Sequence, residues 1–244
     1  MLDNNHESFN PPQTNCILWR YMDITKFLSL LENSKLFLAR SDSFDDPYEG
    51  VWSKAGVNLL KDHNGNNGLP PEAIDQIIKH TDQLKKEMFI SCWFASDHES
   101  AAMWKLYLNS NEGIAIKTDH DSLCEQIEKS TLKARTIKVT YIDYDHHPIP
   151  FSNLFYPFVF KRLSFAHENE LRVMVWSGED VNKSQIAKGS KSVEIDIDLA
   201  QLIKAVHVSP TAPSWFGDLV KQLLVRYSLD VPVQASSLYE RPTF

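Results

Sequence analysis

Two glutamates two residues apart, Glu168 and Glu170 in the segment HENELR, are the side chains best suited to chemistry in this sequence. An alternating apolar pattern predicts a strand over residues 167–176, and side chains two apart on a strand project from the same face. Two carboxylates at one site raise the pKa of at least one of them unless a cation intervenes, which is typical of active sites. Arg172 lies on that same predicted face, so a structural ladder of ion pairs is the alternative interpretation.

A second group of carboxylates follows a predicted strand over residues 35–40. Asp42, Asp45 and Asp46 lie in the segment SDSFDDPYEG, and oxygen ligands of this kind suit a metal ion. The ligand spacing departs from the calcium-loop pattern, and no glycine stands at the position that this loop needs. We therefore favour an Asx turn followed by a Pro-Tyr packing corner, and we predict no metal site.

Aromatic side chains at helical spacing form a third group. Trp104 and Tyr107 are three residues apart in a helix predicted over residues 97–108, so they share a face. Such a pair either stacks on a ligand ring or packs in the core. Cys92 has no visible His or Asn partner, which predicts an inert buried thiol.

Several enzyme classes are excluded by missing motifs. The sequence contains no HExxH, no GxGxxG, no P-loop and no GxSxG motif. A zinc hydrolase, a Rossmann oxidoreductase, a P-loop NTPase and an α/β-hydrolase are therefore set aside.

The elements that must position these residues alternate irregularly between strands and helices, which predicts an α+β fold with one central mixed or split sheet flanked by helices. Asp23 is a predicted helix N-cap, and Pro71 is suited to a helix start. Residues 1–16 are expected to form a flexible arm, and residues 17–244 a single domain. The predicted strands cover residues 17–22, 35–40, 88–94, 112–118, 134–144, 167–176, 193–197, 204–208 and 231–234. The predicted helices follow Asp23 and cover residues 73–86, 97–108, 119–130 and 214–227.

Composition limits the cellular setting. The 244 residues include 25 Lys and Arg against 32 Asp and Glu, which gives a net charge of −7. A protein with this net charge does not bind nucleic acid through its overall electrostatic field. Three cysteines without CxxC spacing disfavour a disulfide framework. The sequence starts without the pattern of a signal peptide, and no apolar run approaches the ~20 residues that span a bilayer. We expect a soluble cytoplasmic protein that makes no membrane contact.

Three segments in order resemble a bacterial family, the domain-of-unknown-function family 2971, whose naming is linked to abortive phage infection. They are LWRYMDITKFLSLLENSKLFLARSDSFDDPYEG, ISCWFASDHESAAMWKLYLNSNEGIAIKTD and KRLSFAHENELRV. The resemblance covers roughly residues 17 to 235. It implies a role in phage defence but carries no established activity.

The order of three shorter motifs is similar to that in ADP-ribosyltransferases, including the toxins that modify nucleic acids. Those enzymes place an Arg or His on a first strand, a Ser-containing strand next and a Glu on a later strand, as Arg20, Ser91 and Glu168 or Glu170 are placed here. Ser-Cys-Trp stands where that pattern has Ser-Thr-Ser. The similarity implies an ADP-ribosyltransferase-like fold with NAD as the substrate. It implies that Arg20 and Arg40 hold the phosphates and that Ser91 binds the nicotinamide ribose. The implied pocket is completed by Tyr21, Trp104 and Tyr107.

The expected function is that of an NAD-dependent ADP-ribosyltransferase or NADase, with Glu170 stabilising the charge that develops on the ribose and Glu168 orienting the acceptor nucleophile. The acceptor, a protein or a nucleic acid, stays open. One alternative is a non-catalytic phage-defence or antitoxin-like module that binds a partner protein. Another is a metal-dependent nuclease that uses Asp42, Asp45, Asp46 and Glu170.

Overall fold

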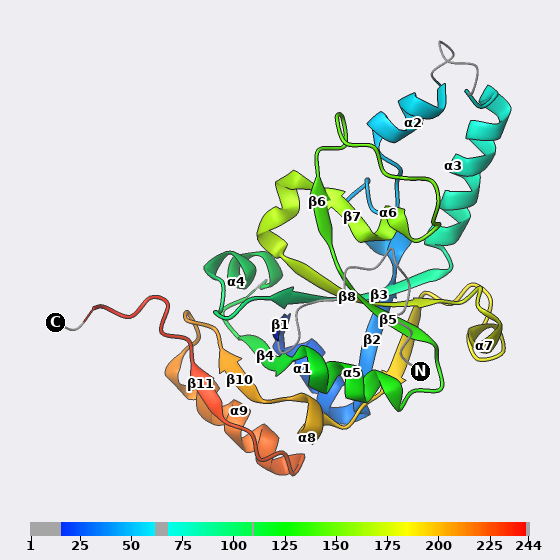
Figure 1. Cartoon of the computed structure of the whole chain (residues 1–244). Helices are drawn as coiled ribbons and strands as arrows, with labels where there is room; N and C mark the ends of the chain where they lie inside the picture. Colours follow the sequence, from blue (N-terminus) through cyan, green and yellow to red (C-terminus); the bar gives the residue numbers. More distant parts are fainter. Residues whose placement is uncertain (1–15, 62–67, 109, 243–244) are drawn as a thin grey trace.

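A mixed sheet of nine strands, branched at β3, organises the computed structural model, which describes residues 16–61, 68–108 and 110–242 (Figure 1). The strand order is β11-β10-β4-β1-β3-β2-β9, and β8 and β5 continue from the other edge of β3. β10 and β11 are parallel, and the other neighbours in this sheet are antiparallel. The strands are β1 (Ile17–Asp23), β2 (Lys35–Arg40), β3 (Met88–Ala95), β4 (Gly113–Asp119), β5 (Ala134–Lys138), β8 (Glu170–Trp176), β9 (Ser192–Asp196), β10 (Ala205–Val208) and β11 (Val233–Ala235). A separate parallel pair holds β6 (Thr140–Ile142) and β7 (Phe160–Arg162).

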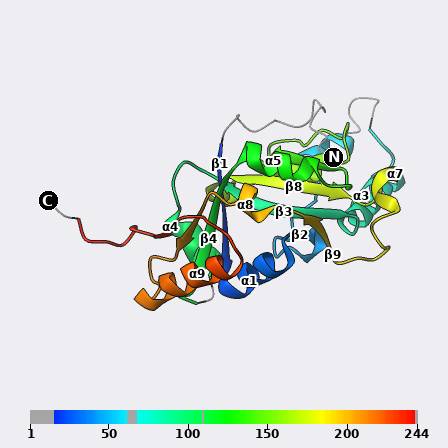
Figure 2. The ribbon, with the colours of Figure 1, turned by 90° about the horizontal axis from the view of Figure 1, so that it is seen from below.

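Helices lie on both sides of the strands, as Figure 2 shows. The largest apolar cluster contains side chains of α1, α5, α8 and α9, whereas α4 packs in a smaller cluster with β1, and α3 and α6 pack in a third with β3, β5 and β8. No helix in the described ranges is both long and apolar enough to cross a membrane. The helices are α1 (Ile24–Asn33), α2 (Lys54–Lys61), α3 (Pro71–Lys85), α4 (Ala101–Tyr107), α5 (His120–Glu128), α6 (Tyr156–Val159), α7 (Asp180–Lys183), α8 (Leu199–Leu202) and α9 (Ser214–Arg226), with 3-10 turns η1 (Ser41–Ser43) and η2 (Leu163–Glu168).

The predicted α+β fold with a mixed sheet flanked by helices is confirmed. Local sequence signals explain many of the element boundaries. Asp23 caps α1 by accepting a hydrogen bond from the backbone N–H of Lys26 at 2.8 Å, as predicted. Ser34 then ends α1 in the left-handed region at φ 50°. β3 is an apolar run because both of its faces are covered.

Three predicted boundaries are wrong, each for a local reason. The strand predicted over 134–144 divides into β5 and β6, because the chain leaves β8 after Lys138 and joins β7. The strand predicted over 167–176 starts only at Glu170, since Asn169 turns the chain at φ 35° after η2. The helix predicted over 97–108 starts at Ala101, because the Ser100 side chain caps it. Residues 1–15 of the predicted N-terminal arm lie outside the described residues.

The two edges of β3 are paired differently, and this difference creates the candidate site. At one edge β8 pairs with residues 88–94 of β3. At the other edge β2 pairs with Phe89 and Ile90, and β1 pairs with Phe94 and Ala95. In the described part of the chain, residues 91–93 have no strand partner at that edge. We call the opening between β1, β2 and residues 91–93 of β3 the fork.

Candidate functional site on the two edges of β3

A set of charged side chains packs around β8 and is here called the β8 network. It consists of Glu170 and Arg172 of β8 with Glu49, Lys161 and Glu168 from other segments. Arg172 is fully buried, and its Nε donates to Glu170 Oε2 at 2.6 Å. Its Nη1 and Nη2 donate to the two carboxylate oxygens of Glu49 at 2.6 and 2.9 Å. Such a fork-to-fork pair fixes geometry as well as charge.

Lys161 brings the two predicted glutamates together. Its Nζ donates to Glu170 Oε1 at 2.6 Å and also to Glu168 Oε2. Glu168 lies at the end of η2 and not on a strand, so strand alternation is not what places the two carboxylates at one site. The convergence predicted from the sequence is present, but a lysine and a turn produce it.

The two carboxylates differ in proton affinity. Burial raises the pKa of Glu168 to about 7, and the neighbouring Glu170 adds to the rise while Lys161 opposes it. Burial also acts to raise the pKa of Glu170, but Arg172, the hydrogen bond with Glu168 and Lys161 together hold that pKa below its ordinary value. Glu170 is therefore a fixed negative charge, and Glu168 is the member that exchanges a proton near neutral pH.

Arg20 occupies the fork on the opposite edge of β3. Its Nη2 donates to the carbonyl oxygen of Phe37 at 3.1 Å, and its guanidinium carbon lies 5.6 Å from the centre of the Trp93 ring. Burial lowers the pKa of Arg20 to about 10, and the ionisable groups that act on it are Cys92 and Tyr107, not a carboxylate. This guanidinium is partly desolvated without an anionic partner among the described residues.

Two polar groups on the residues of β3 that border the fork are unsatisfied. The Ser91 hydroxyl and the Trp93 indole N–H are buried and have no hydrogen-bond partner within the described residues. Buried polar groups in folded proteins nearly always have a partner, so each such group needs an explanation. Ser91 and Trp93 lie on the face of β3 opposite to Cys92, because side chains alternate along a strand.

Cys92 and Tyr107 connect the fork with the β8 network. Cys92 pairs across the strands with Arg172, and burial, followed by the charge of Glu170, raises the pKa of its thiol. Burial also raises the pKa of Tyr107, and the charges of Cys92, Glu168 and Glu170 add to the rise. Tyr107 is 39% exposed, so it lies where a bound molecule can reach it.

Two predicted pocket residues are packed in the core instead. The Tyr21 hydroxyl accepts a hydrogen bond from the Ser100 N–H at 2.8 Å, and the Trp104 indole donates to Glu99 at 2.9 Å. Their rings meet edge to face with centres 4.9 Å apart. Of the two aromatic residues predicted on one helix face, only Tyr107 remains available as a pocket wall.

Ser91 and Glu170 do not face a common pocket. Cys92, Arg172 and Glu170 share one face of the sheet, whereas Ser91 pairs with Val173, which belongs to the large core cluster. The expected convergence of Arg20, Ser91 and Glu170 in one deep pocket is therefore not found, because adjacent residues of a strand point to opposite faces. Arg20 lies against Trp93 at the fork.

Arg40 is already occupied by other partners. Its Nε and Nη2 donate to the carboxylate of Asp42 at 2.6 and 3.0 Å, and its Nη1 reaches the carbonyl oxygen of Ser190 at 3.1 Å. Arg40 thus ties β2 to the segment before β9 and is not directed to the fork.

Three of the four carboxylates that the nuclease alternative uses, Asp42, Asp46 and Glu170, are paired with separate cations. Asp42 pairs with Arg40, Asp46 with Arg162 at 2.7 Å, and Glu170 with the β8 network. Within the described ranges no group of three or more His, Cys, Asp or Glu side chains is arranged to hold a metal ion. This arrangement gives no support to the nuclease alternative.

Glu49 and Lys161 are the members of the candidate site that the sequence did not predict. Glu49 pairs with Arg172 across 123 residues, and nothing in the local sequence marks that pairing. Lys161 lies in the segment KRLSFAHENELR, nine residues before Glu170. A cation close in sequence to two glutamates was the available signal, since a buried carboxylate pair needs a cation.

Comparison with known proteins adds little. No protein-family model and no curated protein matches the chain. Two solved structures are similar, Thermus sp. 2.9 DarT in complex with NAD+ and the same protein in complex with carba-NAD+. The first has a TM-score of 0.43 and 12% identity over 93% of this chain and 98% of that chain, and the second 0.40 and 10% over 92% and 96%. Similarity at this level carries no argument about activity, which therefore rests on the side chains described above.

Proposed function

We propose that the protein is an NAD-consuming enzyme, an ADP-ribosyltransferase or NADase, that binds the dinucleotide at the fork. The observation that carries the proposal is Arg20, a partly desolvated guanidinium without a carboxylate partner. An uncompensated cation costs folding free energy, and an anionic ligand offsets that cost. Guanidinium groups bind phosphate oxygens through paired hydrogen bonds, so the diphosphate of NAD fits this position.

The two glutamates supply the chemistry in this proposal. Cleavage breaks the bond between the ribose C1′ and the nicotinamide nitrogen. The electron pair of this bond leaves with nicotinamide, and positive charge develops on the ribose. The fixed charge of Glu170 stabilises that charge. The acceptor O–H or N–H then attacks C1′, and its proton passes to the carboxylate of Glu168. Water as the acceptor gives ADP-ribose, and a protein or nucleic acid gives the modified product.

The proposal is tested by calorimetric titration of NAD, followed by measurement of released nicotinamide. The parent is expected to bind NAD saturably and to release nicotinamide. Arg20→Met removes a charged hydrogen-bond donor and should weaken binding by about 10- to 100-fold. Glu170→Gln should bind NAD and release no nicotinamide, and Glu168→Gln should bind NAD and transfer little ADP-ribose to the acceptor.

The matched control is Arg40→Met, which removes an arginine of the next strand that is already paired with Asp42. Its NAD affinity should equal that of the parent. Absence of heat at millimolar NAD with the parent protein, or equal affinities for Arg20→Met and the parent, would contradict the proposal.

A non-catalytic binding module, of the phage-defence or antitoxin-like kind, is the second candidate. The observation in its favour is that both oxygens of Glu170 already bind cations, as a purely structural network would have them. Under this alternative the parent releases no nicotinamide at any NAD concentration, and the only effect of Glu170→Gln is a loss of stability.

A further inference from the structure

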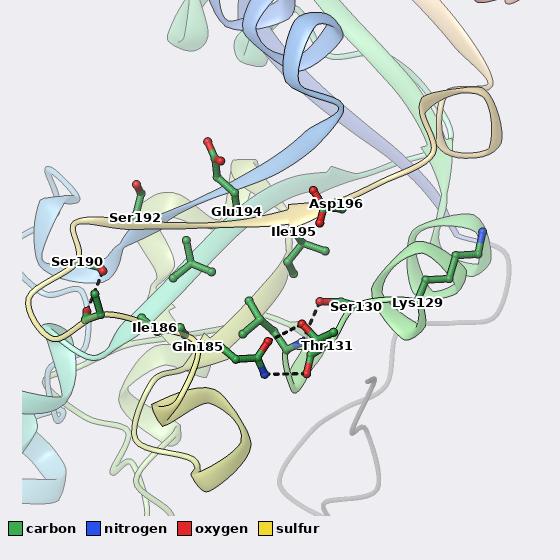
Figure 3. A pocket seen from close by; sticks show the side chains of 13 residues that line it. Lys129, Ser130, Thr131, Gln185, Ile186, Ser190, Ser192, Glu194, Ile195 and Asp196 are labelled. Carbon is green, nitrogen blue, oxygen red and sulfur yellow. Dashed lines mark hydrogen bonds between the residues drawn. The ribbon is translucent and has the colours of Figure 1, made fainter.

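The outer edge of β9 is an open sheet edge that faces a groove. β9 pairs with β2 and, within the described ranges, with no other strand. The groove has a volume of about 650 Å³ and lies between β9 and two segments that follow α5 and α7 (Figure 3). None of the residues predicted for the NAD site lines it. Its lining consists of residues 129–132, 185–187, 190 and 192–196.

The backbone register shows which groups of β9 face the groove. Arg40 N–H donates to the Lys191 carbonyl at 3.1 Å, and Ile197 N–H donates to the Ser34 carbonyl at 3.0 Å. Hydrogen-bonded residues alternate in an antiparallel pair, so residues 191, 193, 195 and 197 direct their backbone groups to β2. The N–H and C=O groups of Ser192, Glu194 and Asp196 therefore point to the open edge.

The side chains of β9 divide into two kinds. Val193 and Ile195 are buried in the large core cluster, and the groove continues their apolar face through Leu132 and Ile186. Glu194 and Asp196 are exposed on the other face. Lys35 approaches their carboxylates at 3.5 and 4.0 Å, so on β9 one ammonium faces two carboxylates. Lys129, which also lines the groove, donates to the Gln201 side chain at 2.6 Å.

The far wall of the groove is held by its own hydrogen bonds. The Thr131 hydroxyl donates to Gln185 Oε1 at 2.5 Å, and Gln185 Nε2 donates to the Thr131 carbonyl at 3.2 Å, as Figure 3 shows. These contacts join the segment after α5 to the segment after α7. The groove is therefore formed before any ligand binds.

We propose that β9 binds an extended peptide segment of a partner protein by strand addition. The segment carries Lys or Arg at alternate positions, opposite Glu194 and Asp196, and small apolar residues between them, opposite Val193 and Ile195. Backbone hydrogen bonds to Ser192, Glu194 and Asp196 supply the pairing. A second copy of this chain is a poor occupant, because pairing two β9 edges brings the acidic side chains of both copies together.

The probe is a fluorescein-labelled peptide of alternating lysine and valine, seven residues long, measured by anisotropy against the full chain. It should bind saturably. Glu194→Pro removes the outward N–H of residue 194 and leaves the hydrogen bonds to β2 in place, since proline is tolerated at strand edges. We expect it to weaken binding by about tenfold, the effect of one lost hydrogen bond and one lost charge contact.

Two controls separate strand pairing from charge attraction and from misfolding. The same peptide with N-methyl groups on alternate amides keeps its charge but cannot pair, and it should not bind the parent protein. Asp218→Lys changes an exposed acid on α9 and should bind the probe like the parent. Equal binding of the N-methylated peptide, an unchanged affinity in Glu194→Pro, or a parent dimer that Glu194→Pro dissociates would overturn the proposal.

Discussion

The charged side chains at the two edges of β3 are in opposite states. At the β8 edge, Arg172 donates to Glu170, to Glu49 and to the Phe158 carbonyl, so its donors are matched to acceptors. At the fork, Arg20 has one carbonyl partner, and the Ser91 hydroxyl of β3 has no hydrogen-bond partner among the described residues. A satisfied network holds a fold together, whereas we propose that the unsatisfied groups at the fork bind a ligand.

We expect the largest loss of stability from substitution of Arg172. Arg172→Met leaves the carboxylates of Glu49 and Glu170 buried without their main partner. We expect a loss of about 3–5 kcal/mol in the free energy of unfolding, measured by urea denaturation. Lys54→Met, which removes the exposed ion pair with Asp145, should change stability by less than about 1 kcal/mol. Equal losses in the two variants would show that the β8 network does not stabilise the fold.

Arg20 should behave in the opposite way. Arg20→Met removes a desolvated cation together with one hydrogen bond to a carbonyl, so the two effects oppose each other. We expect the free energy of unfolding without ligand to change by less than about 1.5 kcal/mol, the value of one hydrogen bond. Stabilisation of the parent by NAD, measured as a rise in Tm, should be absent from this variant. A loss of stability as large as that of Arg172→Met would assign Arg20 a structural role.

The stability that Glu168 contributes to the β8 network should depend on pH. The pKa of Glu168 is raised to about 7 in the folded state, so folding binds a proton between the ordinary glutamate pKa and pH 7. The stabilisation from this proton is present in acid and is lost as the pH rises through about 7. Tm of the parent, compared with that of Glu168→Gln, should fall over this interval.

ADP-ribose transfer to the acceptor should rise over the same interval, because only the deprotonated Glu168 accepts a proton. Parallel Tm profiles for the parent and Glu168→Gln would contradict the assignment. The depressed pKa of Glu170 acts at lower pH, where stability is lost as the pH falls below the ordinary glutamate value.

The smallest effect is expected at Ser91. Ser91→Ala removes a buried hydroxyl that has no hydrogen-bond partner in the described structure, so the change in unfolding free energy should be about zero or slightly stabilising. If a ligand uses this hydroxyl, NAD affinity falls by about tenfold or less. Ser41→Ala is the matched control, because the Ser41 hydroxyl donates to the Lys85 carbonyl at 2.9 Å, and its loss should destabilise the fold.

Local patterns predicted most elements and part of the site. The strand over residues 35–40 and the Asp23 cap follow from side-chain alternation and from one hydrogen bond within a turn. Glu168 and Glu170 were identified as a pair because they are close in sequence. The turn at Asn169 was not predicted, since a left-handed residue between two glutamates leaves the apolar alternation unchanged.

Helix caps and apolar periods can be read from the sequence, because they depend on neighbours within a few residues. Which charges are neutralised depends on the tertiary structure. Arg172 meets a glutamate 123 residues away, whereas Arg20 meets no carboxylate among the described residues. The physical reason is that the pairing of buried charges depends on how strands are brought together. At β3 one edge is closed along its length, and the other opens into the fork.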